Sequence, residues 1–173
     1  AAAREVASAA LQATGTGALA ARLHESMALA CSYLGEDAEA QACLDQAEAV
    51  ESDPAPRAEA RRWSLLGFLA MRRADPERAL GAYERALAIA DRLGLSDLVS
   101  NALLNLASAR QMLGSYGRAR DLYERALRMA RALGRKHSEL LLQANLANVA
   151  LECGAFEEAA RLLDALEPQA SAP

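Results

Sequence analysis

The sequence predicts an all-α protein in which antiparallel helix pairs stack into a solenoid. Of the 173 residues, 53% are hydrophobic but only 4% are aromatic, and there are 10 glycines and 5 prolines. This composition favours helices, because sheets are enriched in aromatic and β-branched residues. The sequence also repeats itself, since the motif YERAL occurs at 83–87 and again at 123–127, a shift of 40 residues. Repetition at this period is typical of stacked helical repeats.

Four copies of the repeat follow one another, and each divides into two predicted helices. The breaks between the two helices of a copy lie 39, 40 and 40 residues apart, at Gly35, Ala74, Gly114 and Gly154. On either side of a break, apolar residues recur at steps of three and four, as one face of a helix requires. Asp75 and Pro76 supply an N-cap and a first-turn proline, and Gly134 supplies a C-cap.

The residues before the first full copy fit the second half of a repeat. Ala2, Val6 and Ala9 reproduce the spacing found in the second helix of the third full repeat. We therefore divide the chain into one such helix of a truncated repeat and four repeats, the last with a C-terminal tail: 1–17, 18–56, 57–96, 97–136 and 137–173. A chain that begins within a repeat and without a methionine is expected to be a piece of a longer array.

These units resemble the tetratricopeptide repeat. The second unit reads Trp63-x2-Leu66-Gly67 and then Ala79-x3-Tyr83-x2-Ala86. The third unit keeps this spacing, as Leu103-x2-Leu106-Ala107 and then Ala119-x3-Tyr123-x2-Ala126. The resemblance implies a right-handed superhelix of about nine helices. The closing proline of the family pattern is absent, so the second helix can run on, which explains a period of about 40 residues instead of 34.

Elongated repeats of this kind are similar to those of kinesin light chain and of bacterial maltose-regulator-type signalling proteins. HEAT and armadillo arrays also have periods near 40 residues, but they lack the small-residue and tyrosine signature. That signature has a packing reason, because small residues are needed where the two helices of a unit cross and a tyrosine fills the remaining space. We expect Ala79 and Ala119 to be fully buried, and Tyr83 and Tyr123 to be largely buried.

Charge and cysteine content narrow the function classes. The net charge of −4 gives no argument for a nucleic-acid partner. No apolar run reaches the ~18 residues of a membrane span, so no membrane partner is expected either. Cys31, Cys43 and Cys153 are odd in number and lack CxxC spacing, which favours reduced thiols and a cytoplasmic location.

No residue pattern indicates catalysis. His24 and His137 have no metal-ligating residue three or four positions further along the chain. The glycine-containing stretches at 15–17 and 114–115 lack the lysine and the spacing of a phosphate-binding loop. We therefore expect a protein without enzyme activity, metal or cofactor.

The resemblance also implies that the first helices of the repeats line a concave groove. The residues expected to face it are Arg22, Glu25, Ser26, Leu29, Tyr33, Leu65, Met71, Leu104, Ser108, Met112, Leu141 and Glu152, and, as the strongest candidates for ligand contact, Asn101, Asn105, Asn145, Asn148, Arg61, Ser64, Phe68 and Arg72. Asn105 and Asn145 hold equivalent places, and each side chain could pair with both polar groups of an extended peptide backbone. The alternative is that asparagine merely suits an exposed helix face.

The sequence thus predicts a module that binds a protein or peptide segment, within a larger bacterial cytoplasmic regulatory protein. Self-association is one alternative, because Leu162, Leu163 and Leu166 in the last repeat are expected to form an uncovered apolar face and a possible homodimer contact. A second alternative is the regulatory arm of a kinase, cyclase or ATPase whose catalytic domain lies elsewhere.

Charge is segregated along the chain. Residues 23–56 hold eight acidic residues and no lysine or arginine, whereas residues 110–136 hold eight lysine or arginine residues. The basic stretch is either a solvated face or a surface for an acidic partner.

Overall fold

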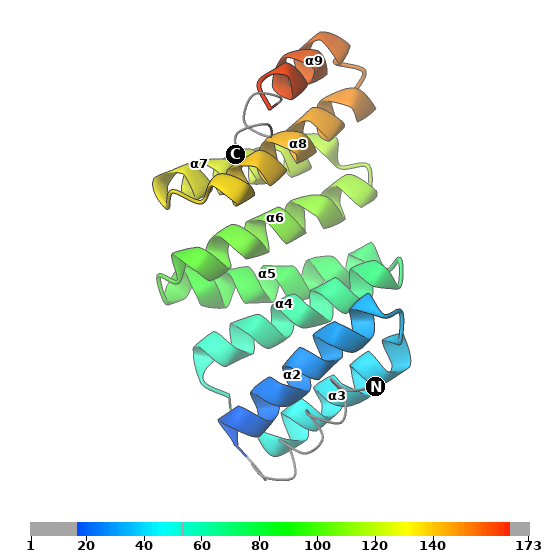
Figure 1. The fold of residues 1–173 in the computed structure, drawn as a ribbon, viewed down its shortest axis with the longest axis vertical. Helices are drawn as coiled ribbons and strands as arrows, with labels where there is room; N and C mark the ends of the chain where they lie inside the picture. The colour runs from blue at the N-terminus through cyan, green and yellow to red at the C-terminus, as the bar shows by residue number, and fades with distance from the viewer. Residues whose placement is uncertain (1–16, 53, 167–173) are drawn as a thin grey trace, which may run out of the picture.

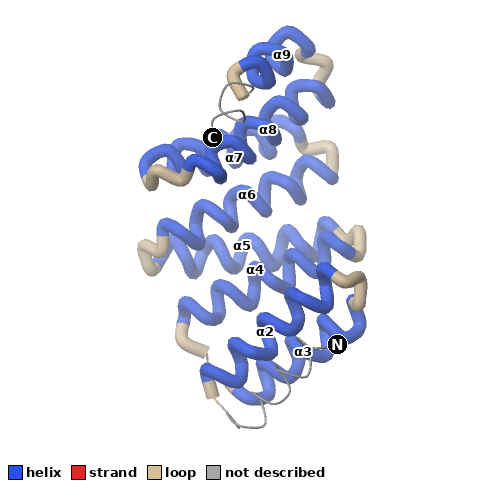
Figure 2. Tube along the Cα trace, viewed as in Figure 1, coloured by secondary structure: helices blue, strands red, loops and turns tan. Residues whose placement is uncertain are grey.

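The computed structural model describes residues 17–52 and 54–166, and within these ranges it contains helices and no strands (Figures 1 and 2). The eight helices are α2 (Ala18–Tyr33), α3 (Asp37–Val50), α4 (Pro56–Arg72), α5 (Pro76–Arg92), α6 (Ser96–Met112), α7 (Tyr116–Ala132), α8 (Lys136–Glu152) and α9 (Phe156–Asp164). This confirms the all-α class. The helix expected before residue 17 and the tail after residue 166 lie outside the described residues.

Consecutive helices form four antiparallel pairs that stack along the long axis, from α2–α3 at one end to α8–α9 at the other (Figure 1). Tight turns within the pairs require a residue with positive φ. Glycine fills this position at 35, 114 and 154, where φ is between 70° and 80°. Ala74 adopts the same left-handed conformation, with φ of 55°, although an L-residue with a Cβ atom is strained there.

The packing expected at the helix crossings is confirmed. Ala79 and Ala119 are 0% exposed, and Tyr83 and Tyr123 are 2% and 1% exposed. A Cβ atom added to Gly67 of α4 would lie 2.5 Å from the Tyr83 ring of α5. The absence of a side chain at Gly67 therefore makes room for the tyrosine, and the small and large residues of one pair are complementary.

The first pair joins the second less regularly than the other pairs join each other. Short turns at 93–95 and 133–135 connect α5 to α6 and α7 to α8. In both cases the two connected helices pack closely. Residues 51–55 form a longer connection between α3 and α4, and these two helices make few contacts. Leu69 of α4 instead packs with Ala28 of α2 and Leu44 of α3 in a small separate core. Asp53 itself lies outside the described residues.

Candidate functional site

A hollow with a volume of about 640 Å³ crosses the first helix of every pair, α2, α4, α6 and α8. We call this hollow the groove. Its apolar lining consists of Leu29, Tyr33, Leu65, Phe68, Leu98, Leu104 and Leu141. The aromatic rings of Tyr33 and Phe68 meet with their centroids 5.6 Å apart and their planes tilted by 52°. Tyr33 is 69% exposed and Leu141 is 44% exposed, so a contiguous apolar surface is open to a ligand.

Polar side chains in the groove differ in whether their hydrogen-bonding groups are already used. Ser26 and Ser64 donate to backbone carbonyl oxygens of their own helices, at 2.9 and 3.0 Å. Asn101 and Asn105 lie one turn apart on α6, and neither amide makes a hydrogen bond with another side chain or the backbone of the described residues. Both asparagines therefore keep a donor and an acceptor for a ligand.

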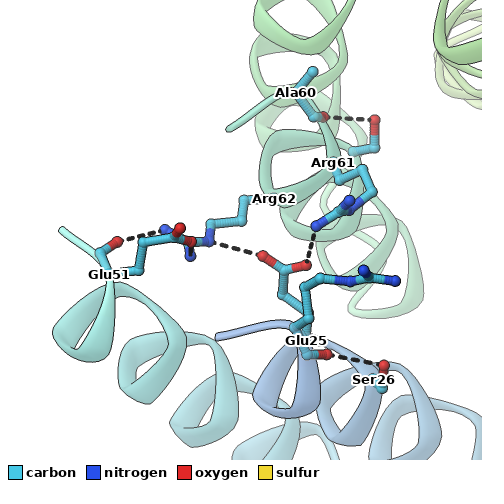
Figure 3. Close-up of polar contacts among 8 residues, drawn as sticks. Glu25, Ser26, Glu51, Ala60, Arg61 and Arg62 are labelled. Carbon is cyan, nitrogen blue, oxygen red and sulfur yellow. Dashed lines mark hydrogen bonds and ion pairs between the residues drawn. The ribbon is translucent and has the colours of Figure 1, made fainter. Parts of the chain in front are cut away.

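Charged groups at one end of the groove are locked in an ion-pair cluster, which Figure 3 shows. Glu25 of α2 is 8% exposed and accepts from two neighbouring arginines of α4. Its carboxylate lies 3.1 Å from Nη2 of Arg61 and 2.8 Å from Nε of Arg62. Arg62 also reaches Glu51, with 2.5 Å between its Nη2 and the Glu51 carboxylate. Arg61, expected as a groove cation, is thus neutralised by Glu25.

Five of the eight strongest candidates from the sequence line the groove: Asn101, Asn105, Arg61, Ser64 and Phe68. Asn145 lines a second hollow of about 320 Å³, which is formed by residues of α4, α6, α7 and α8. Arg72 and Asn148 line neither hollow, and the Arg72 guanidinium is 3.9 Å from the carboxylate of Asp37. Asn105 and Asn145 thus line two different hollows, and their joint contact with one ligand stays a prediction.

Two groove residues did not emerge from the sequence pattern. Leu98 and Ser138 line the groove from the start of α6 and α8. They hold the same place in successive repeats, one turn before Asn101 and Leu141. Repeat periodicity could have identified them, because a position that faces the groove in one repeat is expected to face it in the next.

The second hollow is lined by a hydrogen-bonded chain of polar side chains. The hydroxyl groups of Ser108 and Tyr123 lie 2.9 Å apart, and the Tyr123 hydroxyl donates to Gln111 over 3.0 Å. The Gln111 amide in turn donates to the carboxylate of Glu152 over 3.2 Å. Burial raises the pKa of Tyr123, so its hydroxyl remains a neutral donor. The network holds α6, α7 and α8 together and leaves Asn145 beside it.

Many of the basic residues between 110 and 136 have acidic partners within the chain. The pairs are Arg110–Glu84, Arg120–Glu158, Arg125–Asp91 and Arg131–Glu139. All four connect different helix pairs, so part of the charge segregation serves contacts between repeats. In the described part of the chain, no group of three histidine, cysteine or acidic side chains could hold a metal ion. The same residues include no helix that is long and apolar enough to span a membrane.

Solved structures with the same fold come from functionally diverse proteins. A phosphatase, aspartyl phosphate phosphatase F from Bacillus subtilis, superposes with a TM-score of 0.78 at 15% identity, over 87% of this chain and 40% of its own. The signal-transduction ATPase PH0952 with a tetratricopeptide repeat sensor, from Pyrococcus horikoshii, gives 0.76 at 19% identity, over 86% and 23%. The kinesin light chain-like repeats of Podosopora anserina give 0.74 at 22% identity, over 88% and 76%.

This chain spans less than half the length of the phosphatase and about a quarter of that of the ATPase. At these identities the likeness concerns the fold alone. No curated protein matches the sequence significantly. The tetratricopeptide-repeat family profile matches residues 59–132 and 98–167. Tetratricopeptide repeats form a scaffold that generally mediates protein–protein interaction. Since the two matches together cover more than half of the sequence, the chain belongs to the tetratricopeptide-repeat family.

Proposed function

We propose that the groove binds an extended segment of another protein that carries apolar side chains. The observation that carries the proposal is the combination of a largely apolar lining with the unused amides of Asn101 and Asn105. Apolar side chains of the ligand would bury against Phe68 and Leu141, while the two amides pair with its backbone. Because the carboxylate of Glu25 already neutralises the charge of Arg61, we expect the groove to show no preference for acidic ligands.

The test starts from a random peptide display library selected on the full chain. Leu141→Ala and Leu151→Ala form a matched pair, because both leucines lie on α8 and are 44% and 42% exposed, but only Leu141 lines the groove. We expect Leu141→Ala to weaken binding of the selected peptide about tenfold, since partial burial of a leucine contributes about 1–2 kcal/mol. Leu151→Ala should leave the affinity within about twofold. Fluorescence polarisation with the labelled peptide measures both dissociation constants.

The asparagines are tested with the same peptide. The variant Asn101→Ala/Asn105→Ala is expected to weaken binding by about fivefold to a hundredfold, since each lost neutral hydrogen bond is worth about 0.5–1.5 kcal/mol. Its helix content should be unchanged, because alanine is the better helix former. Asn148→Ala, on the exposed part of α8 outside the groove, is the control. Equal affinity of all three proteins would reject the role of the groove amides.

Self-association through α9 is a second candidate, because this helix exposes two large apolar side chains. Phe156 is 69% exposed and Leu163 is 46% exposed, whereas Leu162 and Leu166 are half-buried. Such a face can pair with a copy of itself. Sedimentation equilibrium of the chain should then show a dimer that Phe156→Ser/Leu163→Ser converts to a monomer. A monomer at high concentration in the unmodified chain would reject this candidate.

We further infer that the chain works as a module of a larger bacterial regulatory protein in the cytoplasm. Support comes from the much greater length of the phosphatase and of the ATPase with which the fold is shared. In such a setting the groove would recognise a segment of a partner while another part of the protein acts on it. Affinity of a separately produced flanking region for the groove would support this arrangement, and its absence would favour a partner in another molecule.

A further inference from the structure

A separate hollow of about 340 Å³ opens between α3 and α4, where the first and second pairs are loosely joined. We call it the outer cleft. Its walls include Leu44, Asp45 and Glu48 from α3 and Glu59, Trp63 and Leu66 from α4. The residues that α4 gives to the groove, such as Arg61 and Ser64, are offset from these by about two positions. At about 100° per residue, the groove and the outer cleft lie on opposite sides of α4.

The outer cleft exists because a regular contact of the solenoid is missing here. In the later pairs the second helix packs closely on the first helix of the next pair, as α5 does on α6. The corresponding helices α3 and α4 make few contacts. Leu44, Trp63 and Leu66 therefore border an open space, in which a ligand could bury apolar surface.

The charge of the outer cleft is strongly one-sided. Asp45, Glu48 and Glu59 form no ion pair with any cation in the described residues, and Asp45 accepts only from the neutral amide of Gln41. The one arginine in the wall, Arg62, is already engaged by Glu25 and Glu51. The apolar wall thus lies beside three carboxylates that no cation of residues 17–52 and 54–166 pairs with.

Trp63 provides a flat aromatic wall that is held in place from the neighbouring helix. The guanidinium carbon of Arg85 on α5 lies 4.4 Å from the centre of a Trp63 ring. Such stacking orients the indole. Arg85 is not among the residues that line the outer cleft, and within the described residues it forms no ion pair with the three carboxylates there.

We propose that the outer cleft binds a partner segment in which arginine or lysine side chains alternate with apolar ones. The basic groups would pair with Asp45, Glu48 and Glu59, and the apolar groups would pack on Leu44, Trp63 and Leu66. This site is independent of the groove, since the two share no lining residue. A protein could therefore hold one segment in the groove and a basic segment on the opposite side of α4.

Trp63 makes the site directly observable, because it is the single tryptophan of the sequence. The probe is the synthetic peptide acetyl-(Ala-Leu-Arg)4-amide, which contributes no tryptophan fluorescence. Titration into the full chain should shift or quench the Trp63 emission with saturable binding. A peptide with citrulline in place of arginine keeps the shape but lacks the charge, and it should bind at least about tenfold more weakly.

Two double variants separate binding in the outer cleft from general attraction to an acidic protein. Glu48→Gln/Glu59→Gln removes two cleft carboxylates, and Glu39→Gln/Glu77→Gln removes two exposed carboxylates outside it on α3 and α5. Both change the net charge by the same amount. We expect the first to weaken binding of the arginine peptide about tenfold, because it removes two charge-assisted contacts that are partly screened at this open site. The second should change the affinity by about twofold or less.

The groove variant Leu141→Ala should bind the arginine peptide like the unmodified chain, so failure of the groove proposal leaves this test intact. Three results would each overturn the outer-cleft proposal. One is an unchanged Trp63 emission at saturating peptide, and another is equal binding of the citrulline peptide. The third is equal weakening in the two double variants, which would show attraction to overall negative charge only.

Discussion

The fit between Gly67 and Tyr83 shows how single residues determine the packing of a helix pair. The tyrosine is 2% exposed, and burial raises its pKa well above the ordinary value, so it stays neutral. In the next pair Ala107 occupies the place of Gly67, and Tyr123 is equally buried. The same crossing thus tolerates one methyl group there, but the distances at Gly67 leave no room for it.

Gly67→Ala is expected to destabilise the protein by about 1–3 kcal/mol, because the added methyl group would overlap the Tyr83 ring. Gly81→Ala is the matched control, since Gly81 lies on α5 and a Cβ atom there would meet nothing within 4 Å. That control should stabilise the protein by up to about 1 kcal/mol through helix propensity. Urea denaturation followed by circular dichroism compares the two. A Gly67→Ala variant as stable as the unmodified chain would contradict the packing described.

Ala74 offers the converse test, because it holds a turn conformation in which the other pairs use glycine. Ala74→Gly should stabilise the protein by about 0.5–1 kcal/mol, since left-handed strain of about 1–2 kcal/mol exceeds the added entropy of the unfolded chain. Gly114→Ala should destabilise it by a similar amount, because a Cβ atom there meets no neighbour and only φ matters. Equal melting temperatures of Ala74→Gly and the unmodified chain would contradict the strain at Ala74.

Helix α4 is attached to the first pair by ion pairs as well as by apolar contacts. The sequence indicated an acidic stretch at 23–56 followed by arginines, but it could not show that Glu25 and Glu51 converge on Arg62. That convergence depends on how α2, α3 and α4 are placed in space. Helix boundaries followed from glycine and proline positions, whereas the loose contact of α3 with α4 depends on the longer connection and was not predicted.

Arg62→Met is expected to destabilise the first pair by about 3 kcal/mol, because it leaves Glu51 and part of Glu25 without a buried partner. Arg57→Met is the control, since Arg57 also lies on α4 and pairs with Asp97, but its side chain is 53% exposed. An exposed pair contributes less than about 1 kcal/mol. Hydrogen exchange should show faster opening of α2 and α3 in Arg62→Met alone. Equal exchange in both variants would mean that the cluster adds no stability.

The stacking of the molecule as a whole was the most predictable feature, because a 40-residue period repeats the same crossing four times. The groove was predictable in outline: repeat periodicity placed Asn101, Asn105 and Phe68 on one face. Asn145 occupies the same repeat position as Asn105 but lines a different hollow, so its contact with a ligand stays a prediction. The bordering side chains differ between the two hollows, since Phe68 and Leu141 line the groove whereas Tyr116 and Tyr123 line the second hollow.

The most direct test of groove binding is the map of backbone amide shifts in an NMR titration with the peptide selected from the display library. Binding in the groove should shift amides of α2, α4, α6 and α8, with the largest changes near Phe68, Asn105 and Leu141. Amides of α3, α5 and α7 should change little. Shifts concentrated on those second helices, with α6 and α8 unaffected, would contradict the proposal that the first helices form the ligand-binding surface.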